Sequence, residues 1–109
     1  MSAITTHVLD TALGRPARGV PVRLSRTAPD QAVLAEAQTD DDGRIADLGP
    51  DEAPPGTYEL RFDVAAYAEA TGQACFFPEV TIAFAVTDER HHHVPLLLSP
   101  FAYSTYRGS

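Results

Sequence analysis

The chain has 109 residues, of which 44% are apolar and 21% are charged. These fractions are typical of a single globular domain and argue against a disordered chain, a collagen-like repeat or a coiled coil. All eight basic residues are Arg, fifteen residues are acidic, and the net charge is −7. Such a chain is a poor candidate for binding nucleic acid or an anionic membrane, because both require clustered positive charge.

The first residues lack the basic start and apolar centre of a signal peptide, and no run of about eighteen apolar residues occurs. We therefore expect a cytoplasmic protein. Cys75 is the only cysteine, so an internal disulfide is excluded and a cysteine-based zinc site lacks partners. We expect Cys75 to be a small buried packing residue rather than a nucleophile.

Nine prolines and seven glycines divide the chain into short segments, which favours strands over long helices. The first predicted strand spans residues 3–9, where alternation assigns Ile4 and Val8 to the core. The opposite face then carries Thr5, His7 and Leu9. His7 is therefore predicted to point away from the core, where a plain surface histidine is the simplest interpretation.

The middle of the chain predicts further strands separated by turns. Residues 20–25 alternate briefly, and Pro21 suggests a strand start or an edge strand. Residues 40–55 are rich in acidic residues and Pro, which predicts a turn-rich loop with at most a very short strand near Arg44. Residues 56–64 alternate strictly and give the strongest strand signal.

One helix is predicted over residues 63–72, with Asp63 suited to its N-cap and Gly72 to the position after its last turn. Residues 80–86 alternate again and predict another strand. Together with the segments near the C-terminus, these elements give seven or eight short strands and one short helix. We therefore predict an all-β sandwich in which residues 1–109 form a single domain.

The C-terminal part predicts strands at residues 90–98 and 102–107. In the first of these, Val94, Leu96 and Leu98 have core parity, whereas His91 and His93 lie on the other face. Three consecutive histidines suggest a metal, but at most two can share one ion on a strand, and a good site needs more ligands. We expect no metal site unless His7 joins the two histidines.

Several segments together resemble a known family. They are Thr6-His7-Val8-Leu9-Asp10, Asp42-Gly43-Arg44, Phe76-Phe77-Pro78-Glu79-Val80, His93-Val94-Pro95 and the terminal Tyr106-Arg107-Gly108-Ser109. The chain resembles the transthyretin-related 5-hydroxyisourate hydrolases over its whole length, and the terminal tetrapeptide is the most specific element because transthyretin itself lacks it. One departure is His92, where members of the family commonly carry Tyr, and its parity points it inward or toward an interface.

The resemblance implies a transthyretin-like sandwich of two four-stranded sheets, assembled as a homotetramer with its sites in a channel between dimers. It implies hydrolysis of 5-hydroxyisourate to 2-oxo-4-hydroxy-4-carboxy-5-ureidoimidazoline in urate degradation, without a cofactor. The implied catalytic residues are His7, Arg44 and His93. The implied substrate-binding residues are His7, Arg44, Tyr106, Arg107, Gly108 and Ser109.

These residue types suit the reaction, which opens a six-membered ring by attack of water on a ring carbonyl. An imidazole can act as general base, and a guanidinium can stabilise the developing oxyanion. Which of His7 and His93 is the base stays open at this point. The alternatives are a transthyretin-like carrier of a small aromatic ligand and a structural or adhesive β-sandwich with incidental histidines.

Overall fold

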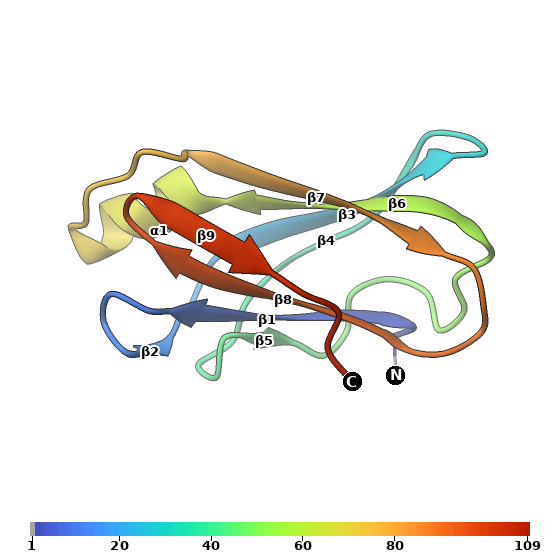
Figure 1. Ribbon diagram of the computed structural model, residues 1–109, viewed down its shortest axis with the longest axis horizontal. Helices are drawn as coiled ribbons and strands as arrows, with labels where there is room; N and C mark the ends of the chain where they lie inside the picture. Colours follow the sequence, from blue (N-terminus) through green and yellow to red (C-terminus); the bar gives the residue numbers. More distant parts are fainter. Residues whose placement is uncertain (1) are drawn as a thin grey trace.

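Two β-sheets and one short helix make up residues 2–109, the residues that the computed structural model describes (Figure 1). The first sheet has the order β2-β1-β8-β9, and β5 lies on the same edge of β1 as β2. Its strands are β1 (Ile4–Asp10), β2 (Arg15–Pro16), β5 (Arg44–Ile45), β8 (His92–Ser99) and β9 (Ala102–Thr105). The predicted all-β sandwich is confirmed, but the first sheet has five strands where the resemblance implied four, because two short strands, β2 and β5, both pair with β1.

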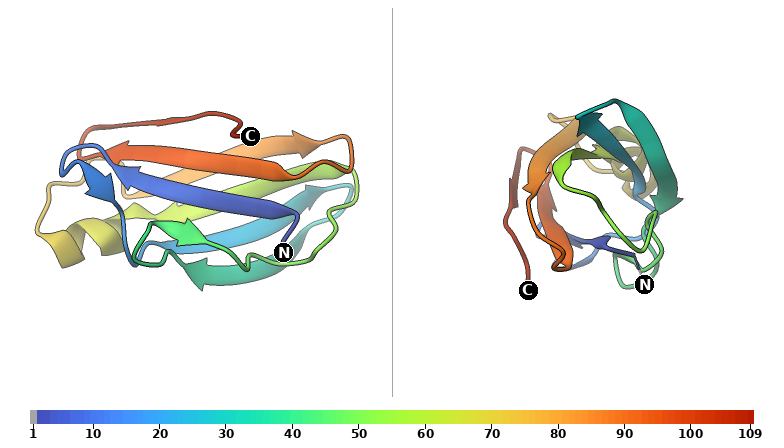
Figure 2. Two further views of the ribbon diagram at one scale, coloured as in Figure 1. Left: turned by 90° about the horizontal axis from the view of Figure 1, so that it is seen from below. Right: turned by 90° about the vertical axis from the view of Figure 1, so that its right-hand side faces the viewer.

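The second sheet has the order β4-β3-β6-β7 and is antiparallel throughout. Its strands are β3 (Pro21–Ala28), β4 (Ala32–Gln38), β6 (Gly56–Asp63) and β7 (Glu79–Val86). Helix α1 (Val64–Thr71) follows β6 directly and lies at one end of the sandwich (Figure 2). Asp63 accepts a hydrogen bond from the Ala66 amide, and Gly72 ends the helix with φ +66°, as its sequence predicted.

The core lies between the sheets and contains the side chains that alternation assigned to it. In β1, Ile4 and Val8 are buried while Thr5 and His7 are only half-buried on the outer face. The largest core side chains come from both sheets and include Leu24, Tyr58, Leu60, Phe62 and Leu96. Within residues 2–109, no helix is long and apolar enough to cross a membrane.

Some sequence expectations were incomplete. Strand β4 was not predicted, because Ala35 and Ala37 are weak strand signals, and none of its residues is fully buried in the structure. Strand β9 ends at Thr105 rather than at Arg107. The expectation that Cys75 is buried was wrong: its side chain is exposed. Cys75 lies in the surface loop between α1 and β7. Its neighbours in the sequence are apolar, but they do not cover its side chain.

His92 is buried in the first sheet, in contrast to its neighbours His91 and His93. Its side chain is 4% exposed, and its Nδ1 atom has no hydrogen-bond partner among residues 2–109. It lines a cavity of about 250 Å³ between β7 and the C-terminal segment. The inward parity of this position was therefore predicted correctly from alternation along β8.

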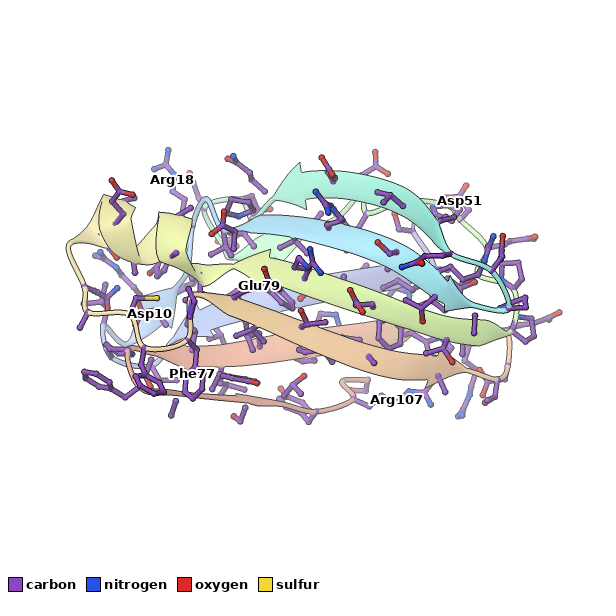
Figure 3. The ribbon with its side chains drawn as sticks, turned by 90° about the horizontal axis from the view of Figure 1, so that it is seen from above. Asp10, Arg18, Asp51, Phe77, Glu79 and Arg107 are labelled. Atoms are coloured by element: carbon purple, nitrogen blue, oxygen red, sulfur yellow. The ribbon has the colours of Figure 1, made fainter. Side chains whose placement is uncertain are left out.

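A buried carboxylate connects the end of β1 to the helix. Asp10 accepts hydrogen bonds from Tyr67 Oη (2.6 Å) and Gln73 Nε2 (3.0 Å), and from the amides of Ala12 and Leu13. Burial raises the pKa of Asp10, but these hydrogen bonds outweigh it and the net pKa is lowered. Burial and the bond to Asp10 raise the pKa of Tyr67 to about 12. Asp10 lies close to the helix end of the sandwich (Figure 3).

We expect Tyr67→Phe to lower the free energy of unfolding by about 1–3 kcal/mol at pH 7, because buried Asp10 loses its shortest hydrogen bond. Urea denaturation measures this difference. The lowered pKa of Asp10 means that the stabilisation is present above the unfolded value of about 4 and is lost as pH falls through the folded value. The difference should therefore shrink in acid. Tyr103→Phe, on the exposed face of β9, is the control and should change stability by less than about 0.5 kcal/mol.

Candidate active site

The outer face of the first sheet brings together His7, Arg44 and His93. Strand β1 pairs with β5 so that His7 lies opposite Arg44, and with β8 in parallel so that Thr5 lies opposite His93. Arg44 and His93 border a cavity of about 280 Å³, and His7 lies beside it, opposite Arg44. Its lining residues are Thr5, Thr6, Arg44, Ile45, Ala46, His91, His93 and Ser109.

His7 is oriented by the backbone of the neighbouring turn. Its Nε2 atom lies 2.9 Å from the carbonyl oxygen of Asp42. A carbonyl oxygen can only accept, so His7 carries a proton on Nε2, and in the neutral ring Nδ1 is the basic nitrogen. The tautomer of His7 is thus defined by a main-chain group that sequence analysis did not single out.

The turn itself depends on Asp40 and Gly43. One carboxylate oxygen of Asp40 accepts hydrogen bonds from the amides of Asp42 and Arg44, both at 2.9 Å. Gly43 has φ +74°, and a Cβ atom there would lie 2.3 Å from the carbonyl oxygen of Val8. Only glycine fits this position, so the Asp-Gly turn holds Arg44 against β1.

Arg44 presents a positive charge that has no acidic partner among residues 2–109. Its side chain is exposed, and it forms no ion pair with any acidic residue of the described part of the chain. Its charge acts on His93, whose pKa it lowers. A free guanidinium beside two imidazoles is suited to bind an oxygen atom that becomes negatively charged.

His93 is half-buried and is held both through its ring and through its backbone. Its Nδ1 atom lies 2.8 Å from Oγ1 of Thr5, and its carbonyl accepts a hydrogen bond from the amide of Gly108 at 2.8 Å. Burial lowers the pKa of His93 below 6.5, and the charge of Arg44 and the nearby His7 and His91 lower it further. The ring is therefore neutral at pH 7 and able to accept a proton.

The C-terminal tetrapeptide divides between two places. Gly108 packs against His93, since a Cβ atom there would lie 2.5 Å from Cδ2 of the ring, and Ser109 lines the cavity. Tyr106 and Arg107 instead line the cavity beside His92, on the β7 side. Of the four implied substrate-binding residues, Gly108 and Ser109 thus lie at the cavity beside His93, and Tyr106 and Arg107 lie at the cavity beside His92.

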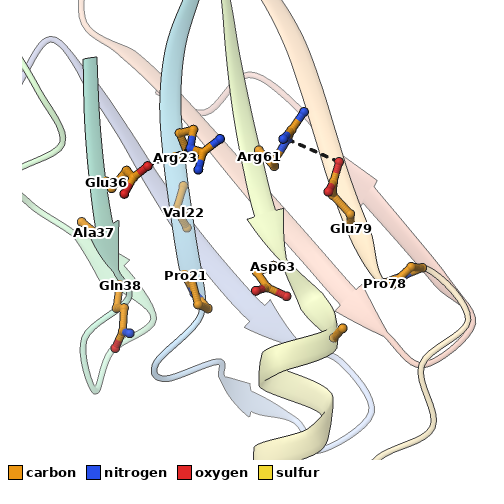
Figure 4. A pocket seen from close by; sticks show the side chains of 11 residues that line it. Pro21, Val22, Arg23, Glu36, Ala37, Gln38, Arg61, Asp63, Pro78 and Glu79 are labelled. Atoms are coloured by element: carbon orange, nitrogen blue, oxygen red, sulfur yellow. Dashed lines mark hydrogen bonds and ion pairs between the residues drawn. The ribbon is translucent and has the colours of Figure 1, made fainter. Parts of the chain in front are cut away.

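A larger groove, of about 730 Å³, lies on the outer face of the second sheet (Figure 4). Both of its arginines are already paired: Arg23 with Glu36 at 2.9 Å and Arg61 with Glu79 at 3.3 Å. The residues that line the groove therefore include no unpaired cation and no histidine. Its larger volume favours this groove as the candidate site, whereas the histidines and the unpaired Arg44 favour the smaller cavity beside His93.

Sequence analysis missed two features of the smaller cavity. Thr5 was placed on the same face as His7 without a role, and His91 was considered only as a metal ligand. Within residues 2–109, no three His, Cys, Asp or Glu side chains are grouped so that they could hold a metal ion. Alternation placed Thr5 on the same face as His7. It did not show which strand pairs with residues 3–9, so the contact of Thr5 with the histidines of β8 was not predicted.

Known proteins resemble this chain over almost its entire length. A 5-hydroxyisourate hydrolase of Mus musculus is 50% identical over 113 residues and covers 99% of this chain and 96% of the relative. One from Caulobacter vibrioides is 46% identical over 115 residues, with both chains covered completely.

Solved structures give the same result for the fold. The 5-hydroxyisourate hydrolase of Klebsiella pneumoniae has a TM-score of 0.87 at 39% identity, covering 97% of this chain and 98% of that one. Sea bream transthyretin, in complex with thyroxine, has a TM-score of 0.91 at 31% identity, covering 97% and 94%. The sequence model of the HIUase/Transthyretin family matches residues 4–108. With its fold, its outer-face histidines and these relatives in agreement, this chain belongs to the HIUase/Transthyretin family.

Proposed function

We propose that this chain hydrolyses 5-hydroxyisourate to 2-oxo-4-hydroxy-4-carboxy-5-ureidoimidazoline, a step of urate degradation. The observation that carries the proposal is that an unpaired Arg44 and His93, whose pKa is lowered, line one cavity, with His7 opposite Arg44 on the neighbouring strand. Relatives of this name at 50% and 46% identity over the whole chain support it. We further propose that residues 1–109 work as a single domain, in the cytoplasm, and need no cofactor, because acid–base and electrostatic catalysis suffice for the reaction.

In the proposed mechanism, His93 is the general base. Its Nε2 atom has no hydrogen-bond partner among residues 2–109, so it can receive a proton from water while the water oxygen attacks a ring carbonyl carbon. The carbonyl oxygen becomes an oxyanion beside Arg44. Collapse of this intermediate breaks the carbon–nitrogen bond of the ring, and the departing nitrogen takes the proton from His93. His7 orients the water or the substrate through Nδ1.

We propose that the tail contributes to substrate binding in two ways. Ser109 lines the cavity and is placed to contact the substrate, while Gly108 allows the tail to approach His93 closely. Tyr106 and Arg107 line the second cavity and hold the tail in position from there. Substitutions of Tyr106 and Arg107 would then act on the reaction through the position of Ser109.

We expect His93→Ala to reduce turnover by about 10²–10⁴-fold, the usual contribution of a positioned general base. The substrate is generated in place with urate oxidase, and its ultraviolet decay is followed against the spontaneous decay. Retention of nearly full activity would remove His93 from the mechanism. If the folded wild-type protein gives no acceleration at all, the carrier alternative is favoured, and binding of a small aromatic ligand is then measured.

The acidic limb of the pH profile, where activity falls as His93 becomes protonated, tests the effect of the Arg44 charge on the pKa of His93. Because the pKa of His93 is lowered, the midpoint of the limb in kcat/KM should lie below pH 6.5. Arg44→Gln removes a cation that disfavours protonation, so it should shift the midpoint to higher pH and lower kcat by about 10²-fold. Arg23→Gln, whose side chain is paired with Glu36 on the other sheet, is the matched control. An unchanged midpoint in Arg44→Gln contradicts the proposed electrostatic role.

We also propose that the protein is a homotetramer with its sites at a channel between dimers. In support, β9 is an edge strand whose residues are all exposed, and large apolar side chains beside it, Phe76 and Phe101, are 67% and 69% exposed. Such edges and patches are typical of protein–protein contacts. Sedimentation equilibrium should give about 47 kDa, four times the 11.7 kDa of one chain. A mass of one chain at micromolar concentration would refute the assembly.

A further inference from the structure

The hydroxyl group of Thr5 lies between two histidines on the outer face of the first sheet. Its Oγ1 atom is 2.8 Å from Nδ1 of His93 and 2.8 Å from Nε2 of His91. The contact follows from the parallel register of β1 and β8, which places Thr5 directly opposite His93. His93 is a member of the proposed catalytic set, whereas Thr5 and His91 have no role in it so far.

Counting hydrogens restricts how these three groups can be arranged. A threonine hydroxyl has one hydrogen to donate and can accept from two donors, and a neutral imidazole has one N–H and one basic nitrogen. If His93 acts as a base through Nε2, its proton must reside on Nδ1. The Nδ1 proton can then be donated only to Thr5, because Thr5 is the sole partner of this atom within residues 2–109.

Thr5 then donates its own hydroxyl hydrogen to Nε2 of His91, which lies within hydrogen-bond distance of Oγ1. The resulting chain runs from His93 Nδ1–H to Thr5 Oγ1 and from Thr5 Oγ1–H to His91 Nε2. When His93 takes up a proton at Nε2, both of its nitrogens are donors and the same chain still satisfies Nδ1. Neither bond has to be rearranged during proton uptake.

The opposite edge of the His93 ring is held as well. Gly108 lies so close to Cδ2 that a Cβ atom there would be 2.5 Å away. The ring is thus confined between Thr5 on the Nδ1 side and the tail on the Cδ2 side. Rotation of the ring by half a turn would exchange these sides and lose the bond to Thr5.

We propose that Thr5, with His91 behind it, is a positioning residue that holds His93 in the tautomer with a free Nε2 atom. The inference rests on the proposed function, because it assigns these residues to the same site and reaction. It follows the general arrangement in which a base is oriented by a third group. Here the third group is a neutral hydroxyl that is itself oriented by a second imidazole.

The kinetic test uses Thr5→Val, which keeps the shape and the strand preference of the side chain and removes the hydroxyl. Because His93 loses its orientation and substrate contacts remain, kcat should fall by about 10–100-fold with little change in KM, a part of what a positioned base contributes. Thr5→Ser restores the hydroxyl and should recover kcat to within about 3-fold. Thr81→Val, on the exposed face of β7, is the matched control and should retain wild-type values.

His91→Phe tests the outer member of the chain. It should lower kcat less than Thr5→Val does, because Thr5 can still accept from His93. In the double variant, the loss should equal that of Thr5→Val alone, since both substitutions interrupt one chain of hydrogen bonds. Additive losses would mean that His91 acts independently of Thr5 and would overturn this part of the inference.

A spectroscopic readout does not depend on activity. Two-bond ¹H–¹⁵N correlation spectra distinguish the two tautomers of each imidazole, and loss of one set of signals in His93→Gln assigns those of His93. In the wild-type protein at neutral pH, Nδ1 of His93 should be protonated and Nε2 free. In Thr5→Val, the form with a proton on Nε2, which free histidine favours, should become dominant, and Thr5→Ser should resemble the wild type.

The outcomes separate the inference from the proposed function. A wild-type His93 that already carries its proton on Nε2 overturns the inference, as does Thr5→Val with an unchanged tautomer and unchanged kcat. Failure of the wild-type protein to hydrolyse 5-hydroxyisourate would defeat the proposed function, whereas the nitrogen signals would still decide the hydrogen-bond arrangement. Thermal melting confirms that each variant is folded when it is measured.

Discussion

The parallel pairing of β1 with β8 is the interaction on which the rest of the site depends. It joins residues almost ninety positions apart in one register, with Thr5 opposite His93. A slip of one residue would turn Ile4 and Val8 out of the core and His7 into it, so burial of the apolar face stabilises this register strongly. The same register aligns the hydroxyl of Thr5 with the ring of His93 and leaves both on the outer face.

Chain segments without regular structure complete the site from two directions. The Asp40–Gly43 turn brings Arg44 and a carbonyl oxygen to His7, and the C-terminal residues fold back onto His93. In both places glycine allows a backbone approach that any side chain would obstruct. Strands thus provide rigid positions for the imidazoles, and the loop and tail bring the groups that bind and polarise a substrate.

Charge is distributed unevenly between the two outer faces. On the second sheet, Arg23 and Arg61 are neutralised by Glu36 and Glu79 across neighbouring strands. On the first sheet, Arg44 has no acidic partner within residues 2–109, and its charge lowers the pKa of His93. An unpaired cation next to imidazoles does not stabilise the fold. Together with burial of the ring, it lowers the pKa of His93, and it leaves an anion-binding group free at the same position.

The sequence by itself determined the elements and their faces, because alternation in a strand depends only on local parity. The outward direction of His7 and His93 and the inward direction of His92 were predicted in this way. The helix was predicted over residues 63–72 from its capping residues and is observed at Val64–Thr71. The resemblance carried by the terminal tetrapeptide and the histidine motifs identified the family.

Strand β4 and the exposure of Cys75 were not predicted, because burial depends on which elements cover a segment. Only the tertiary structure decided which strands are neighbours, and hence that Thr5 lies between His91 and His93 and that Arg107 points away from them. Pairing across long stretches of sequence is a property of the whole core, whose packing selects one register among many, and no local pattern encodes it.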